Sequence, residues 1–73
     1  MLFRSPESRQ YFERLVNEHP DYVATYYQYG KLEEETGNLS QASDLYNKGI
    51  VKAKAANDQK TVRELQQAMD MMY

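Results

Sequence analysis

The only imidazole in the chain is His19, the side-chain type most often used for proton transfer near neutral pH. A catalytic base needs a nucleophile or a carboxylate held beside it, and no motif supplies one. A metal site needs further His or Cys residues at ligand spacing, which the sequence lacks. Since His19 precedes Pro20 at the expected end of a helix, where the dipole favours a cation, we interpret it as an exposed charge. No metal and no cofactor are expected.

Three consecutive carboxylates, Glu33-Glu34-Glu35, form the largest acidic cluster. Successive residues of a helix point in different directions, so these side chains cannot converge on one cation. We interpret the run as a solvated helix face. The sequence also lacks the glycine-rich phosphate loops and the nucleophile-elbow motif. No catalytic residue is predicted, and the chain is not expected to be an enzyme.

Basic residues are spread along the whole chain. Nine Lys and Arg residues are interleaved with eleven acidic residues, and the net charge is −2. Nucleic-acid binding depends on a concentrated basic face, and the only local cluster is Lys48, Lys52 and Lys54. We interpret that cluster as a solvated outer face and expect no nucleic-acid partner.

Length and composition predict one small domain, residues 1–73. A chain of this size buries only about 60% of the surface that its unfolded state exposes, so its core is thin. The absence of cysteine excludes disulfides and favours a reducing compartment. The residues from Met1 to Pro6 contain no apolar signal region, and no apolar run approaches the ~20 residues of a membrane span. We expect a cytoplasmic protein with no membrane partner.

Apolar residues recur with helical period in four segments, and period-two alternation is absent. The fold class predicted is all-α, with four antiparallel helices at about 6–19, 21–36, 40–56 and 58–72. A candidate N-cap stands at or before the start of each one: Ser5, Asp21, Ser40 and Asp58. Pro20 ends the first helix, and Gly37 is expected to end the second in a left-handed conformation.

Small residues interrupt the middle helices. Gly30 lies inside the second helix, where glycine costs about 1 kcal/mol relative to alanine, so a structural reason is expected. Close approach of a neighbouring helix is the reason that we predict. Ala42 and Gly49 in the third helix are expected to allow the same approach.

The sequence also contains an internal repeat. Ser8-x3-Phe12 and Ala42-x3-Tyr46 pair a small residue with an aromatic one turn later, at an offset of 34 residues (42 − 8 and 46 − 12). A period of 34 residues is that of tetratricopeptide repeats.

The central segment resembles a tetratricopeptide repeat in its aromatic and small residues: Tyr26-x2-Tyr29-Gly30, then Gly37-Asn38-Leu39, then Ala42-x3-Tyr46-x2-Gly49. The resemblance implies a superhelix of antiparallel hairpins, with one complete repeat at 23–56. Residues 6–22 would be the second helix of a partial repeat, and 58–72 a capping helix. Glu33 departs from the family pattern, where a tyrosine is usual, and Lys54 replaces a second closing proline. The third helix is therefore expected to continue to about Ala56.

In that family the first helix of each repeat lines a concave groove, so the resemblance implies a groove along residues 21–36. Tyr27, Lys31 and Glu34 share one stripe of this helix at i, i+4 and i+7. The predicted partner-binding residues, which we call the groove face, are Ala24, Tyr27, Gln28, Lys31, Glu34 and Glu35. They suit a peptide or helix of a partner protein. The alternative for Tyr27 is packing against the fourth helix.

Self-association is the second functional hypothesis. The first helix lacks a partner helix from its own repeat, and an open apolar patch marks an interaction site. A symmetric homodimer would cover the patch and enlarge the thin core. The residues predicted for this contact are Leu2, Phe3, Tyr11, Phe12 and Leu15.

Overall fold

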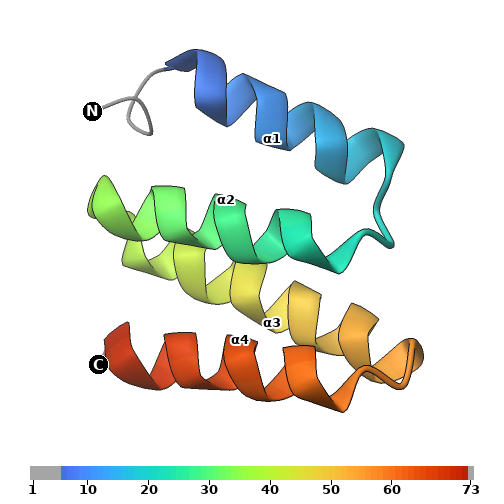
Figure 1. Cartoon of the computed structure of the whole chain (residues 1–73). Helices are drawn as coiled ribbons and strands as arrows, with labels where there is room; N and C mark the ends of the chain where they lie inside the picture. Colours follow the sequence, from blue (N-terminus) through green and yellow to red (C-terminus); the bar gives the residue numbers. More distant parts are fainter. Residues whose placement is uncertain (1–5, 73) are drawn as a thin grey trace.

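The computed structural model describes residues 6–72, which form four helices and no strand. They are α1 (Pro6–Glu18), α2 (Val23–Glu35), α3 (Leu39–Ala55) and α4 (Gln59–Met72). Consecutive helices run in opposite directions (Figure 1). The all-α prediction is confirmed, and each predicted helix end lies within two residues of the observed one. None of the helices in the described part of the chain is long and apolar enough to cross a membrane.

The helix N-termini differ in part from the predicted caps. Asp58 is confirmed as a cap, since its Oδ1 accepts the Thr61 N–H at 3.2 Å. Ser5 lies outside the described residues. Asp21 and Ser40 were the wrong choices, because the N-cap positions fall at Tyr22 and Asn38, neither of which forms a side-chain cap hydrogen bond. The Asp21 carboxylate instead pairs with Lys52 Nζ at 3.2 Å, and Ser40 lies within the first turn of α3.

The C-termini of α2 and α3 end in the same way. Gly37 has φ 90°, as predicted, and the following Asn38 N–H donates to the Glu33 carbonyl oxygen at 2.8 Å. Asn57, at φ 58°, gives α3 an equivalent left-handed ending. These bonds use carbonyl groups that a helix end leaves free, and they turn the chain back for the next helix.

Close contact between helices explains the glycines of α2 and α3. A β-carbon at Gly30 would lie 2.5 Å from Tyr46 Cε1, and one at Gly49 would lie 3.0 Å from both Tyr26 Cβ and Leu65 Cδ1. No ordinary side chain fits at such distances without a shift of its neighbours. The predicted close approach of the helices at these small residues is therefore confirmed.

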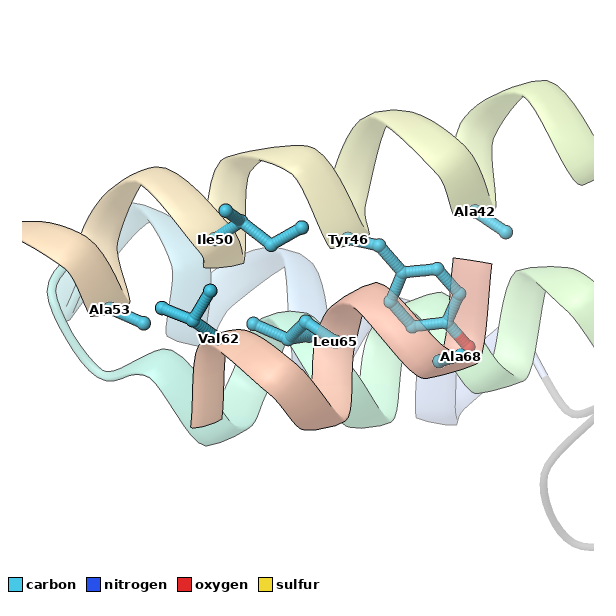
Figure 2. Packing of buried hydrophobic residues seen from close by; sticks show 7 residues of the cluster. All are labelled: Ala42, Tyr46, Ile50, Ala53, Val62, Leu65 and Ala68. Carbon is cyan, nitrogen blue, oxygen red and sulfur yellow. The ribbon is translucent and has the colours of Figure 1, made fainter. Parts of the chain in front are cut away.

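Two apolar clusters fill the interior, and α3 contributes to both. The cluster between α3 and α4 (Figure 2) consists of Ala42, Tyr46, Ile50, Ala53, Val62, Leu65 and Ala68. The cluster that joins α1, α2 and α3 consists of Phe12, Tyr26, Tyr29, Leu32 and Leu45. Because α3 contributes to both clusters, it packs on α2 and on α4 and sets the position of both helices.

An ion pair between the partly exposed Arg9 and the buried Glu33 attaches α1 to α2. The Glu33 side chain is only 2% exposed. Arg9 Nε donates to Glu33 Oε2 at 2.8 Å, and Arg9 Nη2 donates to Oε1 at 3.1 Å. Asn38 Nδ2 donates to the same Oε1 at 2.8 Å. Reading all three glutamates as a solvated face was thus wrong for Glu33, whereas Glu34 is half-buried and Glu35 is exposed.

The surroundings keep Glu33 ionised. Burial by itself would raise the pKa of this carboxyl, but the hydrogen bonds from Arg9 and Asn38 outweigh burial, and its pKa lies below the usual range. The same contact raises the pKa of Arg9. Charge-assisted bonds of this kind compensate for the desolvation of a buried carboxylate.

Candidate protein-binding face

The predicted groove face lies along α2, where its residues border hollows toward α1 and toward α4. Ala24, Gln28, Lys31 and Glu35 are exposed, and Glu34 is half-buried. Tyr27, the one aromatic residue among the six, is 37% exposed. The structure therefore brings the six residues to one accessible surface, and helical spacing is the reason.

Tyr27 is held in place from two sides. Its ring centroid lies 6.2 Å from that of Tyr46 in α3, and Lys31 Nζ lies 5.8 Å from the Tyr27 centroid on the outer side. Lys31 also pairs with Glu34 Oε1 at 3.7 Å. Tyr27 thus packs inward against Tyr46 of α3 while it keeps an accessible edge. Packing of Tyr27 against the fourth helix, the alternative given above, stays a prediction.

A hollow of about 360 Å³ lies between α1 and α2 beside Tyr27. We call it the Leu32 hollow. Its lining residues are Phe12, Tyr27, Gln28, Lys31, Leu32 and Glu35. Four of the six predicted groove-face residues contribute to it. The hollow is therefore lined both by apolar side chains and by polar ones of α2.

Two further hollows lie between α2 and α4, and both include Tyr27 and Glu64. The Asp58 hollow, of about 400 Å³, is lined by Asp21, Tyr22, Val23, Ala24, Tyr27, Asp58, Thr61, Glu64 and Leu65. The Met71 hollow, of about 430 Å³, is lined by Tyr27, Lys31, Glu64, Gln67, Ala68 and Met71. Tyr27 lines all three hollows, and Lys31 lines one on each side of α2, so these two side chains border the hollows toward α1 and toward α4.

The sequence analysis missed the contribution of α4. Glu64, Gln67 and Met71 stand at i, i+3 and i+7, which places them on one side of that helix, beside its apolar face. This spacing was visible in the sequence. What it could not reveal is that α4 lies next to the α2 stripe, because that placement depends on how both helices pack against α3.

Two buried hydroxyl groups near α2 have no hydrogen-bond partner among the described residues: Thr25 Oγ1 and the hydroxyl of Tyr46. Tyr46 is fully buried, and Figure 2 shows its hydroxyl directed toward α4 beside Ala68. Burial raises the pKa of Tyr46, so the phenol stays protonated. An unpaired buried hydroxyl costs stability.

The residues predicted for self-association are only partly available. Tyr11 is 59% exposed, but Phe12 is 8% exposed and its ring stacks on Tyr29 with a centroid separation of 5.8 Å. Leu15 is half-buried and packs against the same cluster. Including Phe12 in an open patch was therefore wrong, because α2 already covers most of it. Leu2 and Phe3 lie outside the described residues.

Within residues 6–72 no group of three or more His, Cys, Asp or Glu side chains is arranged to hold a metal ion. His19 is exposed at the end of α1. Comparison of the chain with protein-family models, with curated proteins and with solved structures finds no match.

Proposed function

We propose that the chain is a tetratricopeptide-like protein-interaction module without catalytic activity, which binds a peptide or helix of a partner protein along the groove face of α2. Such a module would act in the cytoplasm, where a chain without cysteine loses nothing to the reducing conditions. The antiparallel α2–α3 pair, with glycine at its close contacts, supports the tetratricopeptide-like reading.

The accessible position of Tyr27 is the observation that carries the proposal. Its ring is partly exposed and borders hollows toward α1 and toward α4. A partner side chain placed in either hollow would contact this ring and shield it from water. Central aromatic residues that lose water in this way supply much of the binding energy in protein interfaces. Tyrosine also costs little side-chain entropy when it becomes fixed.

Lys31 prepares the polar part of the same face. Its ammonium group lies near the Tyr27 ring and near the Glu34 carboxylate, so it is restrained before any partner arrives. Restraint in the free protein lowers the entropy lost on binding. The face thus combines an apolar anchor with a positioned cation and anion.

The test is affinity capture with a double variant, Tyr27→Ala with Lys31→Ala. We expect this variant to lose the proteins that the unaltered chain retains from extract of its native cells, with unchanged helix content by circular dichroism. The matched control is Val51→Ala with Lys48→Ala, since these residues line a separate hollow on the outer side of α3. Capture that survives in the groove variant, or that is lost equally in the control, would contradict the proposal.

A second candidate is homodimer formation through α1. The observation that favours it is the exposed ring of Tyr11, whose centroid lies 5.8 Å from that of Phe12. The expected result is a mass of two chains by light scattering at micromolar concentration, reduced to one chain by Tyr11→Ser. A single-chain mass for the unaltered protein would exclude the dimer.

A further inference from the structure

The lining of the Asp58 hollow combines apolar, aromatic and acidic side chains. Val23, Ala24 and Leu65 provide apolar surface, and Tyr22 and Tyr27 add two partly exposed aromatic rings. Three acidic side chains belong to the lining: Glu64 of α4, and Asp21 and Asp58 from the segments that precede α2 and α4. No lysine or arginine belongs to the lining. Aromatic rings beside carboxylates, over an apolar floor, are the surroundings that favour an organic cation.

The three carboxylates differ in how far their charge is already balanced. Asp21 pairs with Lys52 at 3.2 Å but remains largely exposed. Hydrogen bonds from Thr61 lower the pKa of Asp58, with a small contribution from Lys60, so this group is ionised. For Asp58 and Glu64, the described residues include no cation within 4.0 Å. The hollow therefore keeps negative charge that a bound cation would neutralise.

We propose that the Asp58 hollow receives an arginine side chain of the partner segment, an inference that rests on the proposed function of the groove face. The aliphatic stem of arginine would lie over Val23 and Leu65, as long cationic side chains do on apolar surfaces. The planar guanidinium would stack on Tyr27 and donate to Glu64. Guanidinium is less strongly hydrated than ammonium and pairs with carboxylates in a two-pronged manner, so arginine fits this lining better than lysine.

The position of the hollow agrees with a segment that follows α2. The Asp58 and Met71 hollows share Tyr27 and Glu64, so they adjoin along the line between α2 and α4. A chain that places arginine in the first could place an apolar residue over Ala68 and Met71 in the second. The partner that fits is a short segment with an apolar residue near an arginine.

The experiment uses a matched pair of peptides, acetyl-Ala-Leu-Arg-Leu-Ala-amide and the same peptide with citrulline in place of arginine. Citrulline has nearly the same shape but no charge. Each peptide is titrated into the full chain, and amide shifts are followed by NMR. We expect the arginine peptide to shift the amides of Ala24, Tyr27 and Glu64 and to bind about fivefold more tightly than the citrulline peptide, as partly exposed ion pairs would give.

Two double variants test whether the carboxylates of the Asp58 hollow cause the preference for arginine. Glu64→Gln with Asp21→Asn should reduce the preference for arginine over citrulline to near unity, with no change in helix content. The matched control, Asp70→Asn with Asp44→Asn, removes the same number of charges at exposed positions outside the hollow lining and should keep the preference. An equal effect of both double variants would show that only net charge matters, which would overturn the proposal.

The outcomes separate this inference from the proposed function. If both peptides shift the groove-face amides with equal affinity, the groove binds peptides and the arginine site is refuted. If a lysine peptide binds more tightly than the arginine peptide, the guanidinium assignment is refuted. If neither peptide binds while the Tyr27 and Lys31 variant still loses capture, the arginine inference fails and the proposed function stands.

Discussion

At the scale of single residues, two interior tyrosines differ in what their hydroxyl groups contact. The Tyr26 hydroxyl donates to the Pro20 carbonyl oxygen at 2.6 Å, which ties α2 to the turn that precedes it. The Tyr46 hydroxyl has no partner among the described residues, although its side chain is completely buried. The same phenol group therefore stabilises the fold at one position and costs stability at the other.

Phenylalanine substitutions test this contrast. Tyr46→Phe removes an unpaired polar group and should raise the free energy of unfolding by about 1 kcal/mol. Tyr26→Phe removes a formed hydrogen bond and should lower it by about 1 kcal/mol. Urea denaturation followed by circular dichroism measures both. A loss of stability in Tyr46→Phe as large as that in Tyr26→Phe would mean that the Tyr46 hydroxyl has a partner.

Because Glu33 is ionised and paired in the folded chain, the free energy of unfolding should depend on pH. Its pKa in the folded chain lies below the value of about 4.3 expected when unfolded. Its ionised form therefore stabilises the fold fully above that unfolded value, and the contribution is lost as the pH falls through the folded pKa. Glu33→Gln should cost about 2 kcal/mol at pH 7, less than the ~3–5 kcal/mol of a fully buried pair, since the Arg9 side chain is 40% exposed.

Between pH 5 and pH 2, the free energy of unfolding should also fall less steeply with decreasing pH in Glu33→Gln than in the unaltered chain, because the variant lacks about one titrating carboxyl. Some slope should remain, because the pKa of Asp58 is lowered too. Urea titrations at a series of pH values give both slopes. Identical slopes for the variant and the unaltered chain would contradict the role assigned to Glu33.

The surroundings of some single residues could not be predicted from the sequence. Glu33 stands inside a run of three glutamates, and nothing local distinguishes it from Glu34 and Glu35. Its partner Arg9 is 24 residues away and reaches it only because α1 packs on α2. Phe12 was misplaced for the same reason, since the ring on which it stacks belongs to another helix.

At the scale of elements, the close contact between α2 and α3 should make Gly30→Ala destabilise the fold, which is the opposite of the usual effect of replacing a helical glycine by alanine. Replacing a mid-helix glycine by alanine ordinarily stabilises a helix by about 1 kcal/mol. Gly30→Ala should instead destabilise the fold by about 2 kcal/mol, because the new methyl group would meet the buried ring of Tyr46. Thermal or urea unfolding of the purified variant measures the change.

A double-variant cycle isolates the cause. Tyr46→Leu shortens the side chain that meets the new methyl group, so Gly30→Ala should cost less in that background than in the unaltered chain. The matched control is Gly37→Ala, whose cost arises from φ 90° with no atom within 4 Å, so Tyr46→Leu should not relieve it. Equal costs of Gly30→Ala in the two backgrounds would mean that backbone conformation, not the ring, requires glycine.

The helices themselves were largely predictable. Pro20, Gly37 and Asp58 act through local backbone chemistry that a sequence displays directly. The wrong caps, Asp21 and Ser40, are residue types that often cap helices, but here the carboxylate of Asp21 pairs with a lysine of α3. Residue type alone did not identify the observed N-cap positions, Tyr22 and Asn38.

At the scale of the whole molecule, α3 positions the proposed binding surface without contributing to its exposed edge. It packs on α2 and on α4 through two apolar clusters, which sets those two helices side by side with hollows between them. The α2 stripe was predictable from helical period, whereas the α4 residues of the surface were not. The surface is a property of the packed chain, and Tyr27 stands at its centre.

The most direct test of the account is site-specific photo-crosslinking. A benzophenone amino acid is introduced at Gln28, on the groove face, or at Gln66, an exposed residue of α4 outside all the hollow linings given above. Irradiation in native cells should give a discrete crosslinked product with a partner protein from position 28 and none from position 66. The same product from both positions, or a product from position 66 alone, would contradict a binding face on α2.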